Sequence, residues 1–258
     1  MTRPTQPPED SGAWNEQQLT DPHRVPDKAA RVQRMFAAIA DSYDLNNRVH
    51  SLWRDQAWRR RVVELCDMRA DDVVVDVACG TGDLALAFAD AEPNRVVGID
   101  FTHPMLRVAD RKRSEHDCPC PVDFIAGDAT RLPLRDQSAD VVSIAFGIRN
   151  VVDPAAAAAE FHRVLRRGGR AAILEFSLPT NPLLRAVYQF YFSRIMPITA
   201  TLLSGDRSGA YRYLPRSVNT FLDRSTMVEM LETVGFGDVR ATPLTFGIAV
   251  AYIGVKAG

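Results

Sequence analysis

A short glycine-rich turn lies between a predicted strand and a predicted helix. Residues 73–77 form a β-branched run, which is typical of a strand buried on both faces of a parallel sheet, and Asp83 begins a helical pattern. Gly80 and Gly82 lack a Cβ, so backbone can approach a ligand closely there. The following helix offers free N–H groups and a positive dipole end. The sequence therefore predicts a ligand site at this turn.

The residues around the turn favour one class of cofactor. The spacing Gly80-x-Gly82-x-x-Ala85 also fits the fingerprint of dinucleotide-binding folds, so the glycines alone leave a nicotinamide oxidoreductase open. Asp76 places a carboxylate at the end of the strand, just before the glycines. A carboxylate repels a pyrophosphate and attracts a cofactor with a sulfonium and an ammonium group. We therefore expect S-adenosylmethionine, with Asp76, Gly80 and Gly82 among its contacts.

Two further carboxylates end the next predicted strands. Asp100 closes the strand at 95–100, about twenty residues past the glycines, where an acidic side chain accepts hydrogen bonds from ribose hydroxyls in doubly wound folds. Capping of the following helix is the other role open to it. Asp128 follows the strand at 122–126 and can accept from an adenine amino group. In a doubly wound sheet Asp76, Asp100 and Asp128 meet at one crevice.

The chain is expected to form one domain at 29–258. Residues 1–28 contain too few apolar side chains to offset the entropy of ordering, which predicts a mobile tail. Two helices within 29–70, interrupted by the polar and aromatic stretch 42–47, precede the first strand and are expected to cap the ligand edge of the sheet. An insertion at about 178–217 is expected to form a lid.

The remaining pattern predicts the fold. A helix at 155–165 has Asp153 as its cap and Gly168-Gly169 as its stop, a loop is expected at 211–217, and a helix at 225–234 follows with Asp223 as its cap. Strands are expected at 73–77, 95–100, 122–126, 139–146, 170–176, 236–242 and 247–255. The last two follow each other on a short connection and should pair antiparallel. This is the Rossmann-like, seven-stranded, mostly parallel sheet of class I S-adenosylmethionine-dependent methyltransferases, whereas a nicotinamide enzyme usually continues with further βα units.

The apolar stretch at 183–203 has three interpretations. Its length approaches a membrane span, but Arg185, Arg194 and Pro197 argue against insertion. An amphipathic lid that binds an apolar substrate or touches a membrane surface remains open, as does simple packing on the core.

Composition excludes several classes of function. The net charge of -1 over 258 residues argues against a general nucleic-acid binder. The four cysteines form no zinc-type ligand set, so no metal is predicted, and Cys118 and Cys120 are expected in a surface loop. The N-terminus shows no apolar signal region, which predicts a cytoplasmic protein.

Several motifs together resemble the menaquinone and ubiquinone biosynthesis C-methyltransferases, over essentially everything from Arg31 onward. The resemblance rests on motifs at 43–58, 80–84, 146–150, 163–177, 213–217 and 244–248. Departures exist, because this family usually has histidine where Asp55 stands and Lys-Pro where Arg166-Arg167 stands. A serine that touches the cofactor in part of the family is Ala145 here.

The resemblance implies both ligands. It implies cofactor contacts at Thr81, Asp100, Asp128 and Ala129, and a reduced polyprenyl quinone that lacks one ring methyl as the substrate. Demethylmenaquinol is favoured over the ubiquinone precursor, because the composition rich in arginine and alanine and the Asp55 variant are similar to the menaquinone branch. A homodimer and peripheral contact with the inner face of the membrane are further expectations.

Arg149 and Asn150, at the end of the fourth strand, are the expected catalytic residues. A hydroquinone ring carbon becomes nucleophilic when the adjacent hydroxyl ionises, and Arg149 can stabilise that oxyanion or orient a water that takes the proton. Tyr43 can add a hydrogen bond from the capping helices. A structural ion pair is the alternative role for Arg149. A non-enzymatic scaffold in a quinone-biosynthesis assembly is a further alternative, whereas nucleic-acid or protein methylation is disfavoured.

Overall fold

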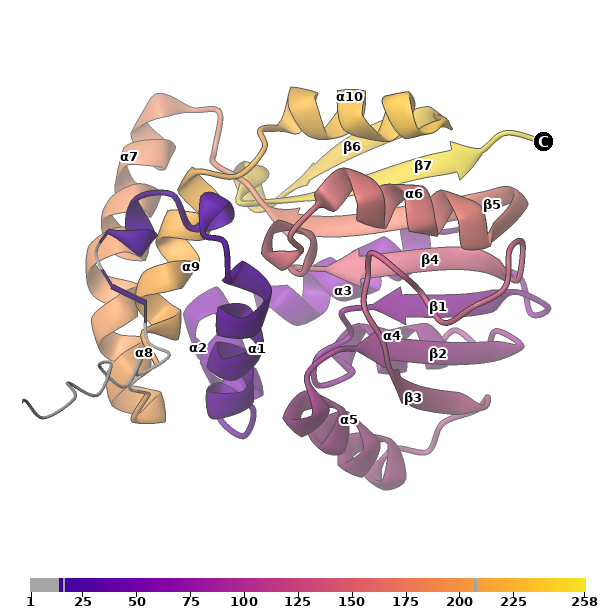
Figure 1. Cartoon of the computed structure of the whole chain (residues 1–258), viewed down its shortest axis with the longest axis horizontal. Helices are drawn as coiled ribbons and strands as arrows, with labels where there is room; N and C mark the ends of the chain where they lie inside the picture. Colours follow the sequence, from indigo (N-terminus) through magenta and orange to yellow (C-terminus); the bar gives the residue numbers. More distant parts are fainter. Residues whose placement is uncertain (1–13, 16, 207) are drawn as a thin grey trace, which may run out of the picture.

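A seven-stranded sheet organises the molecule (Figure 1). The computed structural model describes residues 14, 15, 17–206 and 208–258. The strands are β1 Val73–Val77, β2 Arg95–Asp100, β3 Val122–Ala126, β4 Ala139–Ala145, β5 Leu165–Phe176, β6 Phe236–Leu244 and β7 Ala249–Lys256. Their order is β3-β2-β1-β4-β5-β7-β6; the first five are parallel, and β7 runs antiparallel to both β5 and β6. The predicted fold class is confirmed.

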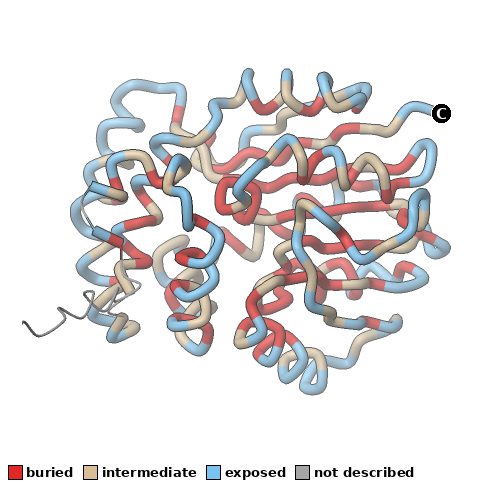
Figure 2. Tube along the Cα trace, in the orientation of Figure 1, coloured by how far each residue is buried: buried red, intermediate tan, exposed pale blue. Residues whose placement is uncertain are grey.

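Alternate residues of the central strands pack into two separate cores. Val75 of β1 points into a cluster with α6 (Pro154–Val164) and α10 (Arg224–Val234). Val74 points into a cluster with α3 (Arg54–Leu65) and α4 (Asp83–Ala89) on the other face. Because both faces of β1 are covered, the strand requires the unbroken apolar run that predicted it. Figure 2 shows this buried centre.

A layer of helices covers the carboxyl ends of the parallel strands (Figure 1). It comprises α1 Lys28–Ile39, α2 Tyr43–Ser51, α7 Pro182–Phe190, α8 Met196–Ser204 and α9 Ala210–Asn219. The helix α5 (His103–Glu115) packs against both β3 and α1. Where α7 and α8 join, the five residues Tyr191–Ile195 form a π-helical turn just before Pro197, whose ring cannot supply an N–H to a regular helix.

The predicted tail is wrong for the described residues between 14 and 28. Trp14 is only 1% exposed and its ring stacks on Tyr213 with centroids 4.5 Å apart, and Leu19 is also buried. Short 3-10 turns at Gln18–Thr20 and Pro22–Arg24 lead into α1. Few apolar residues are present, but Trp14 and Leu19 are large and pack in one cluster with residues of α9, which an average over the composition does not reveal. Residues 1–13 lie outside the described part of the chain.

Two boundary predictions within the capping layer are also wrong. The expected loop at 211–217 lies inside α9, although Pro215 removes one helical hydrogen bond. Burial of the large Tyr211 and Tyr213 side chains offsets that loss. The stretch 42–47 does not interrupt a helix; it begins α2, and the break falls at residues 40–42.

The expected helix stop at Gly168-Gly169 is wrong as well. The helix α6 ends at Val164, and Gly168 and Gly169 belong to β5, beside an irregularity in the pairing of β4 with β5. Gly168 has φ +77, a conformation that glycine adopts without strain. The glycines therefore serve a bulge at the start of the strand. The caps predicted for the flanking helices are confirmed, since Asp153 accepts from the Ala156 N–H at 3.0 Å and Asp223 from the Thr226 N–H at 2.9 Å.

The insertion forms the continuous helical segment of α7 and α8. Among the described residues, no helix is both long enough and apolar enough to cross a membrane. Several large apolar residues of this segment are exposed. In Figure 2 the outer turns of α7 and α8 are coloured as exposed.

We predict that Trp14→Ala lowers the free energy of unfolding by about 3 kcal/mol, because truncating a buried tryptophan removes a large apolar contact and leaves a cavity. The same substitution at Trp53, which is 59% exposed, is the matched control and should change stability by less than about 1 kcal/mol. Urea unfolding of both variants measures the difference. Equal effects would show that the segment around Trp14 does not dock in solution.

Candidate active site

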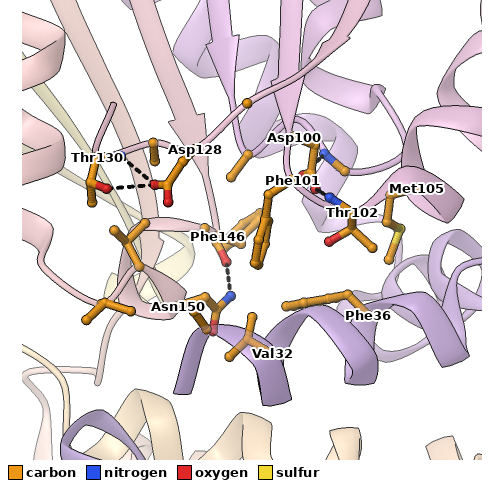
Figure 3. Close-up of a pocket in the computed structure, with 18 of the residues that line it drawn as sticks. Val32, Phe36, Asp100, Phe101, Thr102, Met105, Asp128, Thr130, Phe146 and Asn150 are labelled. Carbon is orange, nitrogen blue, oxygen red and sulfur yellow. Dashed lines mark hydrogen bonds between the residues drawn. The ribbon is translucent and has the colours of Figure 1, made fainter. Parts of the chain in front are cut away.

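A crevice lies where β1, β2 and β4 end and α1 crosses above them (Figure 3). The predicted residues Gly80, Asp100, Asp128 and Ala129 all line it, as does the predicted catalytic residue Asn150. Apolar side chains contributed by α1 and α5 complete the wall, namely Val32, Phe36 and Met105. The crevice therefore combines two carboxylates with an apolar roof, which suits a nucleoside with a polar sugar and a flat base.

Gly80 and Asp100 form the floor of the crevice together. Gly80 has φ +54, and a Cβ built on it would meet no atom within 4 Å, so its backbone stays open to a ligand. Its N–H donates to Asp100 Oδ2 at 2.9 Å, and the Thr102 N–H donates to Asp100 Oδ1 at 2.7 Å. Burial raises the pKa of Asp100. Thr102, not Asp100, is the N-cap residue of α5, so the capping alternative is wrong.

Asp128 stands on the opposite wall of the crevice. Its Oδ1 accepts from both the N–H and the hydroxyl of Thr130, each at 2.8 Å, and these bonds fix the side chain (Figure 3). Among the described residues, none donates to its Oδ2. A carboxylate oxygen with free lone pairs is the acceptor that an amino or hydroxyl group of a ligand requires.

The other predicted cofactor residues support the turn from outside the crevice lining. Asp76 is buried between β1 and β4, where its Oδ1 accepts from Ser143 Oγ at 2.7 Å. Its Oδ2 is buried without a hydrogen-bond partner in the described structure, and burial raises the pKa of Asp76 to about 7. The Thr81 hydroxyl donates to Asp44 Oδ1 of α2 at 2.5 Å. Gly82, with φ +82, leaves room for the Phe124 ring.

A second, larger cavity lies between the sheet and the capping helices. Its volume is about 590 Å³, which is within the range of small-molecule sites. The lining is dominated by aromatic rings: Phe36, Tyr43, Trp58, Phe146, Phe176, Tyr188, Tyr191, Phe192, Tyr211, Tyr213 and Phe246. An aromatic ring with a long apolar substituent would bury its surface well here.

Three aromatic side chains separate the crevice from the larger cavity. Phe36, Tyr43 and Phe146 line both spaces, so a ligand in one would meet a ligand in the other at this wall. Phe146 stacks on Phe176 with centroids 4.4 Å apart. Burial raises the pKa of Tyr43, so its hydroxyl is a hydrogen-bond donor at neutral pH. This places the predicted residue Tyr43 at the junction of the two spaces.

Arg149 lines the larger cavity and also forms a buried ion pair. Its Nη1 donates to Glu175 Oε1 at 2.6 Å and to the Phe146 carbonyl at 2.5 Å. Its Nε is buried and has no hydrogen-bond partner in the described structure. Burial raises the pKa of Glu175, and Arg149 opposes that shift. Arg149 therefore forms the structural ion pair that was its alternative role, and the same guanidinium group also lines the larger cavity.

Asn150 links the crevice to α9. Its Nδ2 donates to the Phe146 carbonyl at 3.3 Å, and its Oδ1 accepts from the Tyr213 hydroxyl at 2.9 Å. Sequence reasoning missed Tyr213 in this role because the segment was expected to be a loop. The side chain of Asn150 is therefore fixed from both ends.

Sequence reasoning also missed Lys28 and Lys112. Lys28 is buried at the start of α1, and its Nζ donates to the carbonyls of Arg149 at 2.9 Å and Val151 at 2.6 Å. Burial, followed by the charge of Arg149, lowers the pKa of Lys28 to about 8. Lys112 of α5 bridges Asp44 of α2 and Asp83 of α4. A signal was available, because the chain has lysine only at 28, 112 and 256.

Comparison with known proteins identifies the family. The model of the ubiE/COQ5 methyltransferase family matches residues 25–256. The chain belongs to this family. The resemblance noted from the motifs is confirmed, and the nicotinamide alternative is excluded with it.

Members of the family from bacteria align over most of the chain. The "Demethylmenaquinone methyltransferase" of Thermus thermophilus is 44% identical over 221 residues, which are 85% of this chain and 99% of that protein. The "Ubiquinone/menaquinone biosynthesis C-methyltransferase UbiE" of Geobacter sp. strain M21 is 42% identical over 91% of this chain and 100% of its own length. Among solved structures, a Thermotoga maritima protein titled SAM-dependent methyltransferase, possible histamine N-methyltransferase, superposes with TM-score 0.60 at 19% identity, covering 87% of this chain and 99% of that one.

The crevice fits the methyl donor of this family. Family and fold confirm the predicted cofactor, S-adenosyl-L-methionine. The open backbone at Gly80 admits a close ligand, and the carboxylates of Asp100 and Asp128 can accept from ribose and adenine. Asp76 does not line the crevice, so the predicted direct contact between its carboxylate and the cofactor is absent from this structure. Thr81 contributes indirectly, because its hydrogen bond to Asp44 connects α2 to the glycine turn.

We predict that Asp100→Asn weakens S-adenosylmethionine binding about tenfold or more, because a neutral amide loses charge-assisted hydrogen bonds to a ribose. Asp123→Asn, on the exposed surface of the adjacent β3, is the control and should leave affinity unchanged. Calorimetric titration measures both. Unchanged affinity in Asp100→Asn would remove that carboxylate from the cofactor site.

A second prediction concerns the pH dependence of stability. The pKa of Asp76 is raised to about 7 in the folded state, so its proton is bound more tightly there than in the unfolded chain. The bound proton therefore stabilises the folded state fully below about pH 4. This contribution to the free energy of unfolding, on the order of 4 kcal/mol, is lost as pH rises through 7. In Asp76→Asn this loss should be absent, whereas the exposed Asp71→Asn should retain it. Urea unfolding between pH 4 and 8 checks this; identical profiles for the three proteins would contradict it.

Proposed function

We propose that the protein methylates a ring carbon of demethylmenaquinol, with S-adenosylmethionine as donor, to give menaquinol. The observation that carries this proposal is the aromatic cavity of about 590 Å³ that shares a wall with the cofactor crevice and is lined by Arg149. The names of the relatives point to the same substrate class for those proteins. The benzoquinol precursor of ubiquinone is the alternative acceptor, and a non-catalytic role in a quinone-biosynthesis assembly is a further alternative.

The residues around the shared wall have separate tasks. The bound cofactor supplies an electrophilic methyl group on a sulfonium. Gly80, Asp100 and Asp128 hold the donor, while the aromatic cavity excludes water and orients the quinol ring at Tyr43. The Arg149 guanidinium, which lines the cavity, stabilises the quinol oxyanion, and the negative charge on that oxygen raises the electron density of the adjacent ring carbon. Arginine stays protonated and therefore does not remove the hydroxyl proton itself; that proton passes to water, as does the ring hydrogen that the methyl group replaces, while the donor leaves as a neutral thioether.

Labelled S-adenosylmethionine and reduced demethylmenaquinone test the reaction directly. We expect label on the quinone ring, and faster transfer than to the benzoquinol precursor of ubiquinone. Preferential methylation of the benzoquinol would establish the alternative acceptor. Absence of transfer to every prenyl quinol would overturn the enzymatic proposal.

Arg149→Ala should lower turnover about tenfold or more and leave the affinity for S-adenosylmethionine unchanged, because a charge-assisted contact worth about 1.5–3 kcal/mol is lost only on the substrate side. This variant also leaves Glu175, which is 2% exposed, as a buried charge without an ion-pair partner. The double variant Arg149→Met/Glu175→Leu removes both charges and should recover stability without recovering turnover. Recovery of turnover in the double variant would reduce Arg149 to a structural role.

We also propose a cytoplasmic location with peripheral contact at the inner face of the membrane, because a polyprenyl quinol is dissolved in the bilayer. The homodimer stays a prediction, which sedimentation velocity would test. A basic surface for nucleic acid is not expected from the net charge of -1.

A further inference from the structure

The insertion exposes an uncommonly apolar surface. None of the residues of α7 is buried, although the helix carries several large apolar side chains. Along α7, the π-helical turn and α8, the exposed side chains are Leu183 at 74%, Val187 at 62%, Phe190 at 63%, Ile198 at 64% and Leu202 at 79%. Within α7 and within α8 these side chains recur every three or four residues, which places them on one face of each helix, and the whole segment is roughly 35 Å long. Scattered apolar residues are ordinary on surfaces, but a contiguous stripe marks an interaction site.

The charges on this segment all have one sign. From Ser177 to Gly205 the chain has no acidic residue, and its charged side chains are Arg185 and Arg194. Both arginines are exposed, and neither has an ion-pair partner among the residues that the structure describes. Exposed apolar side chains with unpaired arginines beside them are complementary to a partner whose interior is apolar and whose surface is negatively charged.

Two strained turns add exposed apolar side chains near the larger, aromatic cavity. Leu52 and Trp53, between α2 and α3, have φ +52 and +59 and are 79% and 59% exposed. Phe246, between β6 and β7, has φ +58 and is 77% exposed. Left-handed conformations cost about 1–2 kcal/mol in residues other than glycine, so these turns lower the stability of the fold while keeping the three side chains exposed to solvent.

These elements converge on the larger cavity. Leu52 and Phe246 line it from the turns, and Tyr188 and Tyr191 line it from the insertion. His50 of α2 is 2.9 Å from the Thr199 hydroxyl of α8, which joins the first turn to the insertion. The exposed apolar side chains therefore surround a cavity that is itself lined by aromatic rings.

We propose that this face, formed by α7, α8 and the turns at Leu52–Trp53 and Phe246, docks on the surface of an anionic lipid bilayer. The apolar side chains enter the boundary between headgroups and acyl chains, while Arg185 and Arg194 contact anionic headgroups. The inference deepens the proposed function: docking here places the aromatic cavity against the bilayer, so a prenyl quinol enters it without crossing water.

A second copy of the chain is the less suitable occupant. A two-fold dimer pairs the same patch with itself, so the arginines of one copy would meet a segment that has no acidic residue to neutralise them. An anionic membrane supplies the missing negative charge instead. Charge complementarity therefore selects the bilayer.

Flotation of the full chain with vesicles tests the docking. On phosphatidylcholine vesicles that contain about one third phosphatidylglycerol, we expect the wild-type protein to bind and Val187→Asp/Phe190→Asp to bind at least about tenfold more weakly. Neither residue lines the cavity. Ala91→Asp adds a charge at the exposed loop before β2 and is the matched control, which should bind like wild type.

A charge-reversal pair gives an independent readout. Arg185→Glu/Arg194→Glu should bind the anionic vesicles at least about tenfold more weakly, and Arg111→Glu on the exposed face of α5 should not. Because all of these side chains are exposed, thermal unfolding should be the same in every variant. Absence of vesicle binding by the wild type, or equal binding by all variants, would overturn the proposal.

Two further measurements separate this proposal from its rivals and from the proposed function. A wild-type dimer that Val187→Asp/Phe190→Asp converts to monomer would overturn lipid docking in favour of a contact between copies. With a short-chain demethylmenaquinol and no vesicles, the docking variants should turn over at the wild-type rate, whereas transfer to a long-chain quinol in vesicles should fall at least about tenfold. Vesicle binding without any methyl transfer would uphold the docking and overturn the proposed function.

Discussion

The buried ion pair between Arg149 and Glu175 is the constraint around which the two cavities are arranged. Moving two charges out of water costs several kcal/mol each, so such a pair persists only where further hydrogen bonds complete it. Glu175 also accepts from the N–H of Phe176 at 2.8 Å, and Arg149 donates to the carbonyl of Phe146. The end of β5 and the turn after β4 are thereby fixed against each other, and both phenyl rings take their places in the cavity wall.

Elements outside the sheet hold this turn in place from the other side. Tyr213 of α9 reaches Asn150, and Trp14 stacks on Tyr213 in turn. Lys28 binds the Arg149 carbonyl from the start of α1. Segments far apart in the sequence thus converge on a few residues at the end of one strand. The sheet supplies a generic platform for the cofactor, and the capping layer gives the site its shape on the substrate side.

Local sequence patterns were sufficient to predict the strands of the sheet and the residues at the floor of the cofactor crevice. The strand at 73–77 is identifiable because burial on both faces demands an unbroken apolar run, and Asp100 because it ends the next strand. Packing between distant segments has no such signature. Trp14 and α9 were misjudged for that reason, since each is ordered mainly by the other. Spacing likewise cannot tell a carboxylate that faces the crevice from one beneath it, which is why Asp76 and Asp128 looked equivalent.

The hydrogen-bond geometry of the lysines explains why these positions are lysine and not arginine, which their charge alone does not explain. Lys28 and Lys256 each donate to two backbone carbonyls, and Lys112 donates to two carboxylates. An ammonium directs its protons to the corners of a tetrahedron, whereas a guanidinium keeps its donors in one plane. Acceptors that diverge around a single nitrogen therefore exclude arginine even where the charge would suit. In a chain whose cations are nearly all arginine, each lysine marks a point where separate segments are fastened together, and such points can be recognised from composition before any fold is known.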